Sequence, residues 1–410
     1  MRLTNKRMTT NFISLVAYQG INYILPLISF PFLYRMLGET YFGLYAFGWA
    51  LVQNLVMITD FGFNLSATKF ISINKENREL VNRHLNSAFV SRILLGILCF
   101  LLLLALIRYV PKFQEHPMFF LLFFGVVAGN IMSPLWFFQG MEKMKYVTLF
   151  NAVAKCGAFI PIFFVVRGTD DYLWVPVFFS LGYCLAGGIC LYFVYVKEGM
   201  NWFLPKGKEI VAVVKDSSAY FLSRVSVSMF TTVNVLVLGL STTYEQVSYY
   251  SRAEKIYQAY NLLLSPFTGV LFPHMAKTKD IPFFKKAFYL IMKLNIPLIA
   301  AAIAGAGILM ALVYADPSAE TVTVFRILMC ACVVTIPSML LGYPFLAALG
   351  HATYVNLVIV IVSVIHVTGI FILYYFGWLS IYTMAVMVIV SELLLFLLRL
   401  KAVVKHRLFQ

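Results

Sequence analysis

Long apolar segments recur along this chain, and they constrain its fold more than any other feature of the sequence. Hydrophobic residues make up 61% of the 410 residues and charged residues only 12%, whereas a soluble globular chain carries about 25% charged residues. A segment of about 20 apolar residues can cross a bilayer, and there only a helix satisfies its own backbone hydrogen bonds. We therefore predict an all-α membrane protein with twelve transmembrane helices. They are expected near residues 11–35, 42–66, 86–109, 117–138, 146–166, 173–196, 216–240, 247–273, 285–314, 321–346, 352–376 and 379–400.

The distribution of basic residues predicts the orientation of these spans. Most of the 32 lysines and arginines lie in the terminal segments and in alternate loops such as 67–85, 197–215 and 274–286. Few lie in the other set of loops, which are short and leave no room for a soluble domain. Because basic loops remain in the cytoplasm, we expect both termini to be cytoplasmic. The basic residues of the other loops are Arg35, Arg108, Lys112 and Arg167.

A weak internal repeat divides the predicted spans into two halves. The stretch Pro134-LWFFQ-Gly140 is matched by Pro344-FLAAL-Gly350, and each follows an even-numbered span at its predicted cytoplasmic end. Six spans followed by six spans, each half starting from the cytoplasm, describe parallel repeats with a site at their interface. We therefore predict two pseudo-symmetric six-helix lobes around a central cavity.

The predicted boundaries follow from the longest cytoplasmic loop. We expect an N-terminal six-helix lobe at 1–196, a cytoplasmic linker at 197–215 and a C-terminal six-helix lobe at 216–410. The linker carries Trp202 and Phe203 among lysines, which is typical of a helix lying at the membrane interface.

Basic residues also occur inside the predicted spans, where each charge costs about 2.5–3.5 kcal/mol at the bilayer centre. They outnumber the acidic residues there, and a surplus of buried cations must be solvated or paired. We therefore predict that the central cavity is cationic and binds an anion, with Arg224 and Lys255 as the main contacts. Arg92 and Arg326 lie within reach of an interface and equally suit snorkelling or a structural ion pair. The full predicted set is Arg92, Lys155, Arg224, Arg252, Lys255, Lys293 and Arg326.

The predicted eighth span carries one of the acidic residues. Glu254 shares a helical face with Gln258 and Asn261. A carboxylate in a span suits ion coupling when its protonation differs between two states. The alternative is that Glu254 only neutralises Arg252 or Lys255.

Two further acidic residues fall inside predicted spans. Asp60 lies near the cytoplasmic edge and is predicted to pair with Lys69 as a gate, and Glu392 precedes Arg399 by two helical turns. We treat both as candidates for ion coupling or gating.

Polar residues at helical spacing in the first predicted span are weaker candidates. Gln19 and Asn22 form a stripe with Pro26 and Ser29, and such stripes bind helices to one another more often than they bind ligands. The sequence contains no metal-ligand spacing and no GxxxxGK[ST] loop. We therefore predict no cofactor and no metal, and no enzyme activity.

Several stretches resemble a known family of transporters. They are YILPLISFPFLYRMLGETYFGLYAF at 23–47, DFGFNLSATKF at 60–70, PLWFFQGMEKMKYVTLFN at 134–151 and YYSRAEKIYQAYNLLLSPFTGVLFPHMAK at 249–277. The chain resembles the Wzx O-antigen flippases, in the polysaccharide-transporter branch of the superfamily that also holds multidrug exporters and the lipid II flippase.

The resemblance implies a function that the predicted cationic cavity suits. A protein of this family would move an undecaprenyl-pyrophosphate-linked oligosaccharide from the cytoplasmic to the periplasmic leaflet of the bacterial inner membrane by alternating access. Membrane lipids, an O-antigen polymerase and a chain-length regulator are the other expected partners, and no nucleic acid is expected. The alternatives are a multidrug exporter of the same fold, which would favour carboxylates in its cavity, and a membrane glycosyltransferase or polymerase, which would need a sizeable periplasmic loop.

Overall fold

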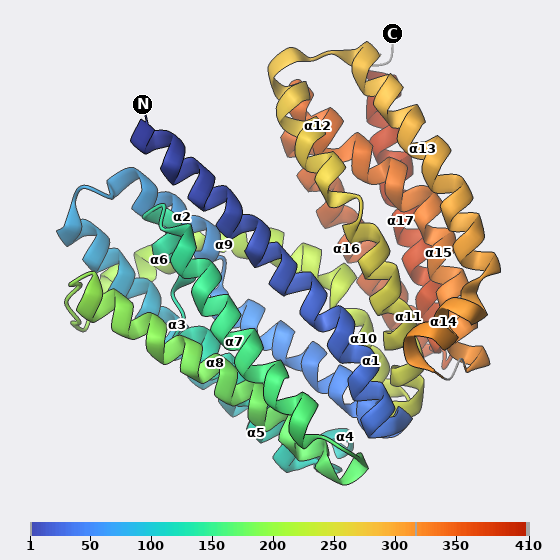
Figure 1. Cartoon of the computed structure of the whole chain (residues 1–410), viewed down its shortest axis with the longest axis horizontal. Coiled ribbons are helices and arrows are strands. Elements are labelled where there is room, and N and C mark those ends of the chain that lie inside the picture. Colours follow the sequence, from blue (N-terminus) through green and yellow to red (C-terminus); the bar gives the residue numbers. More distant parts are fainter. Residues whose placement is uncertain (1, 316–317, 407–410) are drawn as a thin grey trace. The chain divides into compact units, whose positions relative to one another are not determined.

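The computed structural model of the chain describes residues 2–315 and 318–406, with the side chains of residues 2–24, Val227, Phe230, Thr231 and Ser265 excepted. The described residues are helical nearly throughout and include no strand (Figure 1), so the predicted all-α fold class is confirmed. They divide into two compact units. One comprises the residues up to Tyr41 and Gly48–Val225, and the other comprises Phe42–Phe47 and the residues from Ser226 onward. The predicted lobe and linker boundaries remain a prediction.

The first unit contains the helices that precede the middle of the chain. They are most of α1 (Arg2–Asp60), without its residues Phe42–Phe47, then α2 (Phe63–Asn74), α3 (Arg78–Tyr109), α4 (Pro111–Gln114), α5 (Pro117–Ile131), α6 (Leu135–Gly140), α7 (Met144–Val165), η1 (Thr169–Leu173), α8 (Trp174–Tyr192), the π-helical η2 (Phe193–Lys197) and most of α9 (Gly207–Thr231).

The second unit contains the remaining helices. They are α10 (Val233–Ser241), α11 (Tyr244–Leu262), α12 (Ser265–Thr278), α13 (Ile281–Ala304), α14 (Ala306–Tyr314), α15 (Ala319–Leu340), the π-helical η3 (Leu341–His351), α16 (Ala352–Tyr375) and α17 (Ile381–Lys405).

Eight helical stretches of the described chain are long and apolar enough to cross a membrane. Two of them, Leu25–Asn74 with 50 residues and Ala319–Tyr375 with 57 residues, are more than twice as long as the roughly 20 residues that one crossing needs. The chain is therefore a multi-pass membrane protein. The predicted spans near 216–240 and 247–273 fall on α9–α12, outside these eight stretches, because α9 and α11 carry many polar side chains. The number twelve stays a prediction.

The first two predicted spans form one helical element with a sharp interruption. Within α1 the backbone leaves helical geometry at Gly38, with φ 69° and ψ −175°. This left-handed φ favours a residue without a Cβ. The interruption falls between the predicted spans 11–35 and 42–66, where a short turn was expected.

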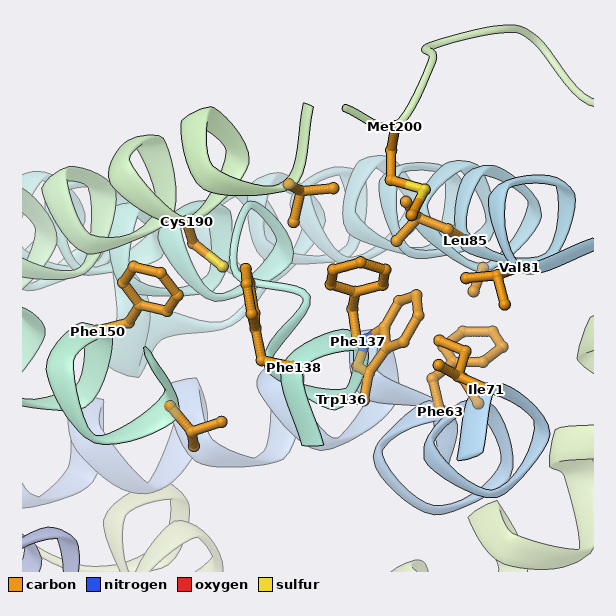
Figure 2. Packing of buried hydrophobic residues seen from close by; sticks show 14 of the residues in the cluster. Phe63, Ile71, Val81, Leu85, Trp136, Phe137, Phe138, Phe150, Cys190 and Met200 are labelled. Atoms are coloured by element: carbon orange, nitrogen blue, oxygen red, sulfur yellow. The ribbon is translucent and has the colours of Figure 1, made fainter. Parts of the chain in front are cut away.

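The WFFQG segment forms the centre of a buried cluster in the first unit (Figure 2). Trp136, Phe137 and Phe138 of α6 are fully buried. Figure 2 shows Phe150 on one side of them and Phe63 on the other. Seven helical elements contribute side chains to this cluster, so it holds together the helices around α6.

Small residues allow α5, α7 and α8 to pack closely in the first unit (Figure 1). A Cβ at Gly182 of α8 would lie 2.5 Å from the Ala154 carbonyl oxygen of α7. A Cβ at Gly187 would lie 2.7 Å from the Gly129 carbonyl oxygen of α5. Close contact through small residues is the usual basis of helix association in membranes.

The linker between α8 and α9 corrects one prediction. Residues 198–206 are not helical, so the expected interfacial helix is wrong for this part, where Pro205 and the positive φ of Gly199 disfavour a helix. The linker instead binds the first unit. Lys143 forms an ion pair of 2.5 Å with Glu198, and the Asn86 amide donates to the Asn201 carbonyl at 3.0 Å.

Candidate functional site

Arg92 of α3 is buried and binds the carbonyl groups at the end of α5. Its Nη2 donates to the main-chain and side-chain oxygens of Asn130, both at 2.8 Å, and its Nη1 donates to the Ser133 carbonyl at 3.3 Å. The Asn130 carbonyl would ordinarily accept from the amide four residues later, but Pro134 has no N–H. The Asn130 carbonyl accepts instead from the Ser133 amide at 3.0 Å, and Arg92 adds a second, charged donor to it. The fold of the first unit therefore accounts for this cation.

Asp60 lies beside Arg92 at the end of α1. It is buried, and neither carboxylate oxygen has a hydrogen-bond partner of standard geometry in the described part of the chain. The charges of Arg92 and of Arg224 on α9 both act on it. No ion pair within 4 Å joins Asp60 to Lys69 among the described residues, so the expected gate between these two is absent from this conformation.

The DFGFNLS motif brings Asp60 and α9 together. Gly62 has a φ of 80°, and a Cβ there would lie 2.8 Å from the Phe221 amide nitrogen of α9. The rings of Phe61 and Phe221 stack at 4.3 Å, and the Ser66 and Ser217 hydroxyls are 2.6 Å apart. Only glycine allows this approach, which places the Asp60 carboxylate near α9.

Arg252 of α11 is fully buried in the second unit. Its Nη2 donates to the Ser318 hydroxyl at 3.1 Å, and its guanidinium lies 5.3 Å from the Tyr249 ring and 5.8 Å from the Tyr314 ring. Ser318 also caps α15. These contacts hold α11 close to the end of α14 and the start of α15.

Arg399 lies near the end of the predicted last span, 379–400, and is buried. The helix α17 continues beyond that span to Lys405, and Arg399 is only 6% exposed. Its Nη1 donates to the Ser338 carbonyl at 2.8 Å and to the Ser338 hydroxyl at 3.0 Å. Its charge acts on Glu392, two turns earlier, which also lies near Thr335 of α15.

The remaining predicted cations are less buried. Arg224, Lys293 and Arg326 are exposed, and Lys155 and Lys255 are half-buried. Arg326 donates from Nε to the Ile303 carbonyl at 3.3 Å, near the end of α13. Lys255 donates to the Gln258 side chain at 3.4 Å.

Glu254 is 5% exposed on α11, and the Lys255 charge acts on it. Arg252, one of its two predicted partners, is directed to Ser318 and the two tyrosines. Gln19 and Asn22 lie outside the residues whose side chains are described.

A hydrogen-bonded chain of polar side chains near Glu254 was not predicted from the sequence. His366 of α16 bonds to Ser391 of α17 at 2.7 Å and to Asn234 of α10 at 2.9 Å. Asn234 in turn donates to the Tyr250 hydroxyl of α11 at 3.4 Å. The available signal was a histidine and an asparagine inside apolar runs, where a buried polar group needs a partner.

The comparisons with known proteins identify the family. Residues 8–279 match the family model of the polysaccharide biosynthesis proteins. A protein of Escherichia coli strain K12 named "Putative O-antigen transporter" is 30% identical over 282 residues, which are 67% of this chain and 66% of that protein. The chain thus spans just under two thirds of that relative. A Shigella dysenteriae protein of the same name is 26% identical over 97% of this chain and 100% of its own length.

The fold has a solved counterpart. The structure of the lipid II flippase MurJ in an inward closed conformation matches with a TM-score of 0.73 and 15% identity, over 96% of this chain and 87% of that chain. At this identity the likeness concerns the fold. The family model covers more than half of the sequence, and the chain therefore belongs to the polysaccharide biosynthesis protein family.

Proposed function

We propose that the chain is a flippase that moves undecaprenyl-pyrophosphate-linked O-antigen repeat units from the cytoplasmic to the periplasmic leaflet by alternating access. The family, the names of the two relatives and the MurJ-like fold support this proposal. The observation that carries it further is the exposure of Arg224 and Lys293 within predicted spans. A cation at membrane depth requires water or an anion, and a pyrophosphate supplies the anion.

Arg224 and Lys255 are the proposed pyrophosphate contacts, with Lys155 and Lys293 as second choices. Arginine binds phosphate through two parallel hydrogen bonds and lysine binds it as a point charge. We leave Arg92, Arg252 and Arg326 out of the proposed site. Their guanidinium groups already bind carbonyls, a hydroxyl or aromatic rings of their own unit.

The distribution of charge favours an anionic cargo over a cationic drug. Asp60 and Glu254 are buried, whereas Arg224 and Lys293 are exposed. A multidrug exporter of the same fold would need accessible carboxylates to bind cations. The names of the relatives likewise favour a transporter over a glycosyltransferase or a polymerase.

The proposed location is the bacterial inner membrane, with both termini in the cytoplasm. The substrate is a lipid-linked oligosaccharide, which enters from surrounding membrane lipids. An O-antigen polymerase and a chain-length regulator are proposed partners, because they would use the repeat unit after it has crossed.

Replacement of Arg224 tests the substrate site. Arg224→Ala should abolish O-antigen display in a deletion strain complemented with the chain, and Arg224→Lys should restore part of it because the charge survives. Display is measured by gel analysis of lipopolysaccharide, with protein levels from an immunoblot. Arg108→Ala removes an exposed arginine from the end of α3 and should leave display intact. Undiminished display with Arg224→Ala would remove this residue from the site.

Glu254 is the proposed ion-coupling residue, with Asp60 and Glu392 as further candidates for coupling or gating. All three are carboxylates near cations inside the units, so their protonation depends on the local arrangement. In proteoliposomes loaded with undecaprenyl-pyrophosphate-linked repeat units, Glu254→Gln should abolish substrate-driven proton flux. Persistence of both flux and transport would leave Glu254 a structural counter-ion.

A further inference from the structure

His366 lies at the centre of a hydrogen-bonded chain that crosses four helices of the second unit. The chain runs from Ser391 on α17 through His366 on α16 and Asn234 on α10 to Tyr250 on α11. Ser391 is 1% exposed and the other three side chains are fully buried. Glu254, one turn after Tyr250, acts electrostatically on the Tyr250 hydroxyl. These hydrogen-bonded side chains therefore extend from α17 to the neighbourhood of Glu254, the proposed ion-coupling residue.

The neutral form of His366 has a partner at each ring nitrogen. Asn234 uses its amide N–H to donate to Tyr250, which leaves its side-chain oxygen to accept from His366 Nε2 at 2.9 Å. Nε2 then carries the proton of the neutral ring, and Nδ1 accepts from the Ser391 hydroxyl at 2.7 Å.

The protonated form is equally well bonded. When Nδ1 gains a proton it donates to the Ser391 oxygen, and the Ser391 hydroxyl hydrogen turns to the Met387 carbonyl, which lies 2.9 Å away. Nε2–H continues to donate to Asn234. Uptake of one proton thus breaks no heavy-atom contact, because Ser391 only reverses its role from donor to acceptor.

Few charged groups lie near His366. The α9 residues of this unit, from Ser226 on, carry no charge, and neither does α10. Their contact with α16 is the Ser363 hydroxyl donating to the Ser226 carbonyl at 2.8 Å. On α11 the titratable groups near the chain are Tyr250 and Glu254, and on α17 Glu392 follows Ser391 directly.

We propose that His366 is a proton-binding site of the second unit, linked through Asn234 and Tyr250 to Glu254. The proton comes from water and binds Nδ1. The resulting imidazolium favours the ionised form of Glu254, because opposite charges stabilise each other. The physiological meaning rests on the proposed ion-coupled flippase, but proton uptake by His366 is measurable without transport.

The test is a pH titration of the protein labelled with ¹⁵N-histidine and held in lipid nanodiscs. The nitrogen chemical shifts distinguish the neutral ring from the imidazolium. The proton is the only ligand varied in the titration. His366→Gln identifies the His366 signals. A protein in which the other histidines are replaced and His366 is kept gives the same assignment with the chain intact.

We expect His366 to change from the Nε2–H form to the imidazolium as the pH is lowered from about 8 to the acid limit at which the protein stays folded in the nanodisc. Asn234→Asp places a carboxylate against Nε2–H and should raise the midpoint by about one unit or more, a tenfold gain in proton affinity. If the network had only a structural role, Asn234→Asp would destabilise the protein and would not raise the midpoint.

Each other outcome overturns the proposal. A ring that stays neutral in the native protein down to the lowest pH at which the protein stays folded excludes the site, even if it titrates in Asn234→Asp. A native ring that titrates with a midpoint unchanged in Asn234→Asp excludes the proposed contact. A failure of O-antigen display by the native chain would instead refute the flippase, whatever His366 does.

Discussion

At the scale of single residues, the buried arginines separate structural from substrate-binding cations. Arg92 binds the Asn130 carbonyl at the end of α5, and Arg399 binds Ser338 close to the start of η3. Arg399 also packs against Gly342, where a Cβ would lie 3.1 Å from its guanidinium carbon. In both units a buried arginine thus stabilises the helix near the repeated Pro…Gly stretch.

The role of Arg92 can be tested by a change that keeps its charge. Arg92→Lys loses the two-pronged contact with Asn130 and Ser133, whose carbonyls keep only their backbone donors, and losing hydrogen bonds from a charged group costs about 1.5–3 kcal/mol. We expect a lower midpoint of thermal unfolding for the detergent-purified protein, followed by size-exclusion chromatography after heating. Arg108→Lys, at an exposed position, is the matched control. Equal midpoints for both variants would contradict the structural role.

At the scale of helices, close packing in the first unit depends on the absence of side chains at a few positions. Gly182 and Gly188 lie on the same helix, but only Gly182 faces α7, and a Cβ at Gly188 would meet nothing within 4 Å. The two positions therefore distinguish the effect of helix propensity from the effect of packing.

We expect Gly182→Leu to push α8 away from α7 and to destabilise the protein by about 1–3 kcal/mol, the usual cost of overpacking. Gly188→Leu should be neutral or slightly stabilising, because leucine favours a helix more than glycine does. Thermal unfolding in detergent compares the two variants. If both lost the same stability, the cause would be a general effect of leucine on α8 and not its contact with α7.

At the scale of the whole molecule, the distribution of basic loops predicts the orientation in the membrane. The linker residue Lys206 and the loop residue Glu115 are both exposed, so each can be changed to cysteine in a background without the native cysteines. In intact cells an impermeant thiol reagent should label the cysteine at position 115 and should label position 206 only after the membrane is opened. The reverse pattern would invert the topology and the proposed direction of transport.

The sequence by itself determined the helical class and the ends of several helices. A long apolar segment in lipid can satisfy its backbone only as a helix, and for this reason the predicted spans 86–109, 146–166 and 352–376 end at or within one residue of the ends of α3, α7 and α16. The separate linker at 197–215 stays a prediction. The sequence failed on the form of the linker, because a helix was inferred from an amphipathic composition that an extended segment also satisfies.

Only the tertiary structure decided what the charged residues do. The seven candidate cations could be identified from the sequence, because a charged residue stands out in an apolar segment. Their partners lie far away along the chain: Arg92 binds Asn130, Arg252 binds Ser318, and His366 binds Asn234. A hydrogen bond depends on distances of about 3 Å between atoms, and these are set by how helices pack, not by spacing within one helix. The burial of Arg399 beside Ser338 likewise depends on the packing of α17 against α15.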